Sequence, residues 1–155
     1  MKNLMDVPPV WLGVFVAAAW VQGQYLSLGL AWPQPFASLL GGGLIGLGLI
    51  LIGLAAFELW RHRTTIMPHA DTCAIAPASL VQSGIFARSR NPIYLADAFI
   101  LSGLVLRWDA VLCVILVPVF MWWIARHFIE AEEIRLQNHF GDDFPGYARK
   151  VRRWL

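Results

Sequence analysis

The chain has 155 residues, of which 58% are hydrophobic and only 14% are charged. This composition excludes an ordinary soluble globular domain, in which about 25% of residues are charged. The formal net charge of +2 is less informative about binding partners than the position of the basic residues. That position indicates that the chain contacts a membrane surface, and we expect no nucleic-acid partner. The length suits one all-α membrane domain, with residues 1–60 as two packing helices and residues 61–155 as the functional core.

The first two apolar segments are long enough to cross a bilayer. Residues 10–30 carry no charge, and at roughly 1.5 Å per residue such a helix reaches about 30 Å. Pro33 and Pro35 then predict a tight turn. Residues 36–59 form the second predicted span, in which Gly42 and Gly46 are a small-x-x-x-small pair that favours close helix packing.

A polar stretch over residues 60–92 separates these spans from a predicted helical hairpin. Residues 93–106 are apolar but short for a full span, and residues 110–124 resume the apolar pattern. Arg107 and Asp109 mark the junction between them. We therefore expect about four transmembrane helices.

After residue 124 the helix is predicted to continue to Phe140 as an amphipathic cytoplasmic stretch. Glu132 and Glu133 flank its apolar stripe, whereas Glu130 is expected to project to the opposite side. Gly141 is a natural helix stop. The basic end of the chain, from Arg149 to Arg153, is interpreted as an anchor on anionic lipids.

The distribution of basic residues predicts the orientation. Of the 12 Lys and Arg residues, all but Arg107 lie in the N-terminus, the middle polar stretch or the C-terminal tail. The positive-inside rule therefore places both termini and the middle stretch in the cytoplasm, in a bacterial inner membrane or an equivalent one. The two cysteines, Cys73 and Cys113, form no motif that would indicate a metal site or a redox pair.

Polar residues gather at two places that suit ligand chemistry. Arg90 and Asn91 precede Pro92, which favours a helix start whose free amides attract a carboxylate, and Tyr94 adds an aromatic face. Asp97 follows inside an apolar segment, where an ionisable group faces either a cavity or a partner. The Glu132–Glu133 pair is the second place.

The order and spacing of these motifs resemble the isoprenylcysteine carboxyl methyltransferase and phospholipid methyltransferase superfamily over residues 60–155. The motifs are Thr64-Thr65 with Pro68, Leu80-Val81-x-Ser83-Gly84-x-Phe86, Arg90-Asn91-Pro92-x-Tyr94-Leu95, Glu132-Glu133-x-x-Leu136-x-x-x-Phe140-Gly141, Tyr147, and Val151-Arg152-Arg153-Trp154-Leu155. The resemblance implies an integral membrane methyltransferase that uses S-adenosylmethionine at the cytoplasmic face, with membrane lipids around it and a lipid-borne or small apolar acceptor.

The resemblance also implies the site residues. Those expected to bind the cofactor are Leu80, Phe86, Arg90, Asn91, Pro92, Tyr94, Glu132 and Glu133. If the acceptor is an amine or a thiol, a base must remove its proton, and Glu132, Asp97 or His127 would serve, whereas a carboxylate needs no base. The alternative function is a small four-helix transporter that uses Asp97. The oligomeric state stays open.

Overall fold

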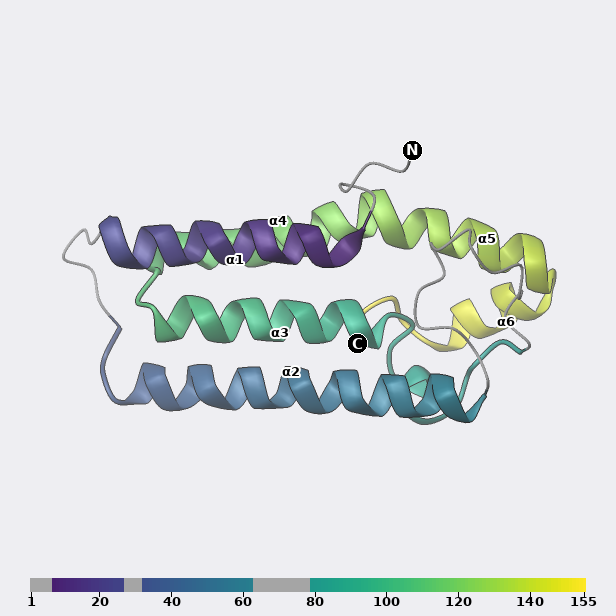
Figure 1. Cartoon of the computed structure of the whole chain (residues 1–155). Coiled ribbons are helices and arrows are strands. Elements are labelled where there is room, and N and C mark those ends of the chain that lie inside the picture. Colours follow the sequence, from purple (N-terminus) through teal and green to yellow (C-terminus); the bar gives the residue numbers. More distant parts are fainter. Residues whose placement is uncertain (1–6, 27–31, 63–78) are drawn as a thin grey trace. The chain divides into compact units, whose positions relative to one another are not determined.

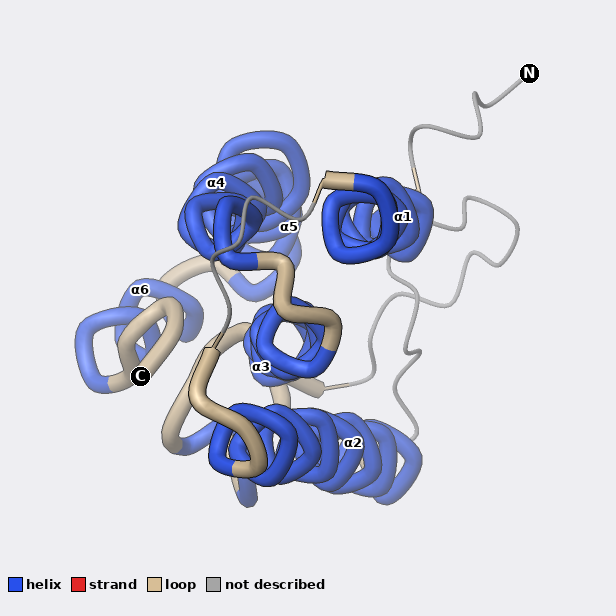
Figure 2. The backbone as a smooth tube through the Cα atoms, turned by 90° about the vertical axis from the view of Figure 1, so that its left-hand side faces the viewer, coloured by secondary structure: helices blue, strands red, loops and turns tan. Residues whose placement is uncertain are grey.

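The computed structural model describes residues 7–26, 32–62 and 79–155. All regular elements among these residues are helices, and no strand occurs in them (Figures 1 and 2). The prediction of an all-α fold is confirmed. The elements are α1 (Pro8–Tyr25), α2 (Phe36–Arg61), the 3-10 helix η2 (Gly84–Ala87), α3 (Pro92–Arg107), the 3-10 helix η3 (Val111–Ile115), α4 (Leu116–Ile124), the π-helical η4 (Ala125–Ile129), α5 (Glu130–Phe140) and α6 (Asp143–Lys150).

Each of the four predicted apolar segments contains a helix. Among the described residues, two helical stretches are long and apolar enough to cross a membrane: Phe36–Arg61, in which an 18-residue segment has a mean hydropathy of 2.3, and Val111–Phe140, in which such a segment has a mean hydropathy of 1.9. The predicted continuation from the fourth segment to Phe140 is confirmed. The first helix ends at Tyr25, and residues 27–30 of that predicted span lie outside the described residues.

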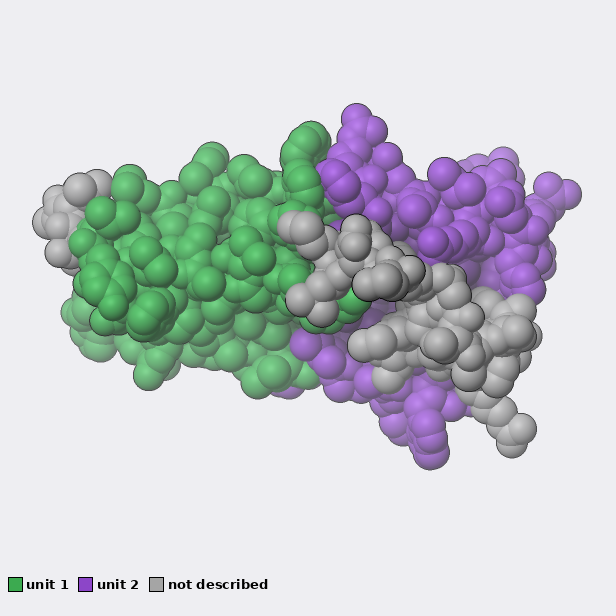
Figure 3. Space-filling view, turned by 45° about the horizontal axis from the view of Figure 1, so that its top comes forward, with its two compact units in different colours: residues 1–49, 94–124 green, residues 50–93, 125–155 purple. Residues whose placement is uncertain are grey.

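The chain divides into two compact units, coloured separately in Figure 3. Residues 1–49 and 94–124 form the first unit, and residues 50–93 and 125–155 form the second. The apolar segments make up most of the first unit. Most of the polar residues singled out in the sequence belong to the second.

In the first unit, α1 packs against η3 and α4 through aromatic side chains. The ring centroids of Trp11 and Trp123 lie 4.7 Å apart, and those of Phe15 and Phe120 lie 5.4 Å apart in an edge-to-face arrangement. Further along, the thiol of Cys113 lies 3.8 Å from the carbonyl oxygen of Ala18. Along these three contacts the residue numbers rise in α1 and fall from α4 to η3, so α1 runs antiparallel to that segment.

Also in the first unit, α2 and α3 approach closely at Gly41 and Gly48. A Cβ atom added at Gly41 would lie 2.7 Å from the carbonyl oxygen of Gly103, and one at Gly48 would lie 2.8 Å from that of Ala96. Cβ atoms added at Gly42 or Gly46 would meet no atom within 4 Å. The contact between these helices therefore uses a different glycine pair from the predicted one, because α3 packs on the neighbouring face of α2.

Asp109 ties together the two turns of the first unit. Its carboxylate accepts a hydrogen bond from the Trp32 amide at 3.1 Å and lies 3.4 Å from Nε2 of Gln34. The guanidinium of Arg107 donates to the hydroxyl of Ser38 at 3.1 Å. The charged junction of the predicted hairpin thus meets the proline-rich turn, so both turns lie at one end of this unit.

The second unit has its own apolar core beneath α6. Phe144, Tyr147 and Val151 are buried there, and the side chains packed against them are Leu80, Leu136, Phe140 and Ala148. Gly141 ends α5, as predicted, with a φ of 54° and a ψ of −124°, a conformation that glycine adopts readily but that lies outside the left-handed helical region. Asp142 occupies the N-cap position of α6 but makes no side-chain capping hydrogen bond.

Candidate functional site

The segment before α3 is shaped by Gly84 and Pro92. Gly84 has a φ of 58°, and a Cβ atom there would lie 2.5 Å from Oε1 of Glu58, so only glycine fits this turn. The buried Glu58 accepts a hydrogen bond from Ser83 at 2.7 Å, and Nε2 of His62 lies 2.9 Å from the same hydroxyl. Pro92 is the first residue of α3, as predicted. Arg90 therefore lies in a turn whose backbone is held in place by Gly84 on one side and by the start of α3 on the other.

The C-terminal segment binds this turn mainly through backbone atoms. The amide of Arg90 donates to the carbonyl of Arg152 at 3.0 Å, and the side-chain amide of Asn91 donates to the carbonyl of Arg153 at 3.0 Å. The tail was predicted to be a lipid anchor, and for Arg153 that interpretation is wrong, because its side chain binds Glu133. Arg152 is exposed.

Tyr147 fastens α6 to the same turn. Its hydroxyl donates to the carbonyl oxygen of Phe86 at 2.6 Å. Burial raises the pKa of Tyr147 to about 12, although the nearby Arg90 opposes part of that rise. The phenol therefore stays protonated and keeps its hydrogen bond.

We expect Tyr147→Phe to lower the free energy of unfolding by about 1 kcal/mol near neutral pH, because it removes one buried hydrogen bond. The pKa in the folded state lies above the unfolded value near 10, so the contribution of the phenol is complete below pH 10 and is lost as pH rises toward 12. Thermal unfolding in detergent from pH 8 to 12 checks this. The difference between the two proteins should shrink above pH 10, and a constant difference would contradict the assignment.

An ion cluster joins this turn, α5 and the C-terminal segment. Arg90 lies 2.9 Å from one oxygen of Glu133, and Arg153 donates to both oxygens, at 2.6 and 3.2 Å. Glu130, one turn earlier on α5, lies 3.9 Å from Arg153 and 3.3 Å from Arg126. The side chains of Arg90 and Glu133 are only 15% and 18% exposed, so water screens their interaction weakly.

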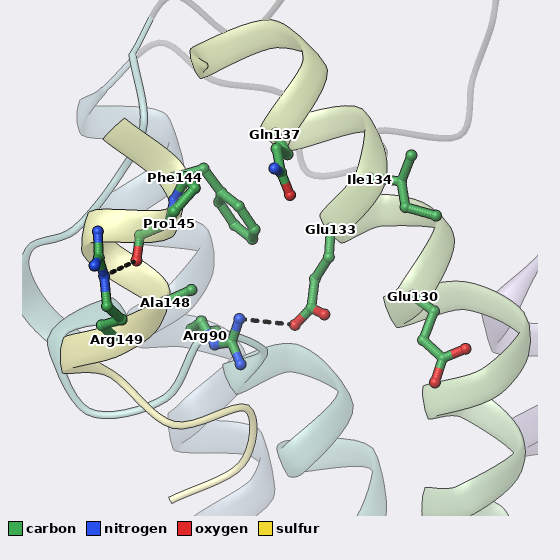
Figure 4. A pocket seen from close by; sticks show the side chains of 9 residues that line it. All are labelled: Arg90, Glu130, Glu133, Ile134, Gln137, Phe144, Pro145, Ala148 and Arg149. Atoms are coloured by element: carbon green, nitrogen blue, oxygen red, sulfur yellow. Dashed lines mark hydrogen bonds and ion pairs between the residues drawn. The ribbon is translucent and has the colours of Figure 1, made fainter. Parts of the chain in front are cut away.

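An open cavity of about 620 Å³ lies beside this cluster. Figure 4 shows Arg90 and Glu133 pointing toward each other at one side, with Gln137 and Phe144 at the other. The lining residues are Arg90, Glu130, Glu133, Ile134, Gln137, Phe144, Pro145, Ala148 and Arg149. Both signs of charge, an amide and an aromatic face therefore border one space, which suits a ligand with a zwitterionic end and an aromatic end.

Arg90 retains an unused donor. Its Nε atom is buried and has no hydrogen-bond partner within the described part of the chain. A buried donor without a partner costs free energy comparable to a lost hydrogen bond. The side chain of Arg90 also borders the cavity, where its guanidinium can bind a carboxylate.

The structure brings only two of the predicted cofactor-binding residues to this cavity, Arg90 and Glu133. Leu80, Phe86, Asn91 and Pro92 support it instead, through the core beneath α6, the hydrogen bonds described above and the start of α3. Glu132 is on α5 but does not line the cavity, and His127 is exposed in η4. Tyr94 and Asp97 belong to α3 in the first unit.

Four polar residues of this site were not predicted: Glu130, Gln137, Arg149 and Arg153. The expectation that Glu130 projects away from Glu133 was wrong, because residues three apart share one face of a helix. The same spacing could have found Gln137, which follows Glu130 and Glu133 on that face. No signal in the sequence distinguishes Arg153 from its basic neighbours.

Comparison with known proteins identifies the family. The family model described as phospholipid methyltransferase matches residues 36–143, more than half of the chain. The chain belongs to the phospholipid methyltransferase family. This confirms the resemblance found in the sequence, and together with the two long apolar helices it indicates a membrane methyltransferase. No curated protein and no solved structure matches the chain.

Proposed function

We propose that this protein transfers a methyl group from S-adenosylmethionine to a lipid-borne or small apolar acceptor, and that the cavity between α5 and α6 receives the methyl donor. The observation that carries this proposal is the pairing of opposite charges, Arg90 and Glu133, at the wall of a cavity in a member of a methyltransferase family. Its volume of about 620 Å³ lies within the range of roughly 300–1,000 Å³ for small-molecule sites.

The residues of the cavity fit the chemistry of the donor. An amino-acid end carries a carboxylate and an ammonium group, which suit the guanidinium of Arg90 and the oxygens of Glu133. Ribose hydroxyls suit Glu130, and the adenine ring suits the face of Phe144 and the amide of Gln137. Ile134, Pro145 and Ala148 are apolar and would cover the uncharged parts, and Arg149 is a second cation in the lining.

When bound, S-adenosylmethionine supplies a methyl group activated by the positive charge on its sulfur. The task of the protein is to align the acceptor and to keep water out, because methyl transfer needs no covalent intermediate with the enzyme. For an amine or thiol acceptor, a base must take one proton, and Asp97, Glu132 and His127 are the residues we assign to this role. For a carboxylate acceptor no base is required.

We further propose that the four apolar helices all cross the membrane, with both termini and the cavity on the cytoplasmic side. The two long apolar stretches support this topology, and so does the distribution of Lys and Arg along the sequence, where Arg107 alone lies between the third and fourth apolar segments. A lipid-borne acceptor would then be supplied by the bilayer itself. The transporter alternative has no support among these features.

A binding titration followed by a product screen tests the function. Purified protein in detergent should bind S-adenosylhomocysteine, the demethylated product, and should transfer radiolabelled methyl groups from S-adenosylmethionine to a component of a lipid extract. Circular dichroism establishes that the protein remains helical during the titration. Folded protein with no affinity for either form of the donor would overturn the proposal, and the chemical class of a labelled lipid would identify the acceptor.

A further inference from the structure

Glu133 is held from two sides, and the two sides are not equivalent. Arg90 contributes one contact, to Oε1 at 2.9 Å, whereas Arg153 contributes two, to Oε1 at 3.2 Å and to Oε2 at 2.6 Å. If Arg90 is drawn away, Glu133 keeps both hydrogen bonds to Arg153. A two-point contact of this kind fixes the plane of a carboxylate as well as its position.

Arg90 is the partner that a ligand can recruit. It lines the cavity, and its one contact with Glu133 is the contact that a ligand can replace. Arg153 is absent from the cavity lining, and the carbonyls of its own segment are bound by Arg90 and Asn91. The hydrogen bond to Glu133 raises the pKa of Arg153 further, so this guanidinium stays charged.

Resting on the proposed function, we propose that Arg153 is a positioning residue for zwitterion recognition. The amino-acid end of the ligand breaks the Arg90–Glu133 ion pair. Its carboxylate then pairs with Arg90, and its ammonium group pairs with Glu133. Arg153 holds Glu133 in place during this exchange. One ion pair is replaced by two, and a ligand without the amino-acid end gains nothing from the exchange.

Two ligands separate this role from a general effect on folding. S-adenosylhomocysteine carries the zwitterionic end, and methylthioadenosine has the same nucleoside thioether without it. In isothermal titration we expect Arg153→Met to weaken S-adenosylhomocysteine by about tenfold or more and to leave methylthioadenosine within about twofold. The backbone contacts of the C-terminal segment are retained in this variant. Lys150→Met, which removes an exposed cation from the end of α6, is the matched control and should change neither affinity.

Two further variants test the route through Glu133. Arg153→Lys keeps the charge but loses the two-point geometry, so it should recover only part of the loss. Glu133→Gln combined with Arg153→Met should bind S-adenosylhomocysteine no more weakly than Glu133→Gln alone, because both changes remove one interaction. Fully additive losses would show that Arg153 acts by another route and would overturn the inference.

The failures are distinguishable. If the wild-type protein binds S-adenosylhomocysteine and Arg153→Met binds it equally well, the inference is overturned and the proposed function stands. Equal losses for both ligands would show that Arg153 only supports the fold of the segment, which also overturns the inference. A folded wild-type protein that binds neither S-adenosylmethionine nor S-adenosylhomocysteine overturns the proposed function and this inference together.

Discussion

Arg90→Ala should weaken the binding of S-adenosylhomocysteine by roughly thirtyfold, equivalent to about 2 kcal/mol, in a calorimetric titration. The substitution removes the cation that borders the cavity beside Glu133. It leaves Glu133 with both hydrogen bonds to Arg153, so the loss falls on the ligand more than on the fold. The backbone amide that binds the C-terminal segment is also retained.

Arg88→Ala is the matched control for this prediction. Arg88 lies two residues earlier in the same turn, carries the same charge and is exposed. Its removal should leave the affinity within about twofold, because exposed charges are screened by solvent and salt. A similar loss in both variants would show that the basic character of the turn matters and that the specific position of Arg90 does not.

The helices were predictable because each depends on a local property of the sequence. Long apolar runs, the prolines of the first turn and the stop at Gly141 all act within a few residues. Pro92 likewise begins α3 where a proline is best tolerated. Arg90, beside a helix start, and Glu133, beside an apolar stripe, were both expected at the site, and both line the cavity.

The pairing of side chains was not predictable in the same way, because it depends on segments that are distant in the sequence. Four basic residues occur between Arg149 and Arg153, and only the docking of the C-terminal segment on the turn at Arg90 decides which one reaches Glu133. Asn91 was expected to bind the cofactor because of the motif resemblance, and in the structure its side-chain amide donates to the carbonyl of Arg153 in that segment. A sequence motif therefore indicates that a residue is needed. It does not indicate whether that residue contacts a ligand or holds the residues that line the cavity.

The glycines of α2 show the same limit of sequence-based prediction within an apolar helix. Gly41, Gly42, Gly43, Gly46 and Gly48 are equivalent in sequence terms, and a spacing rule selects Gly42 with Gly46. Only the position of α3 determines the face that is used. A Cβ atom at Gly103 would lie 2.5 Å from the carbonyl oxygen of Gly41 and 2.7 Å from a side-chain carbon of Ile45.

Gly103→Ala should therefore lower the free energy of unfolding by about 3 kcal/mol, since a methyl group cannot fit without moving one helix backbone away from the other. Gly42→Ala is the control on the facing helix, where an added Cβ meets no atom within 4 Å. There the better helix propensity of alanine should raise stability by about 0.5–1 kcal/mol. Reversible unfolding in mixed detergent measures both changes, and effects of equal sign and size would mean that α2 and α3 do not pack through this face.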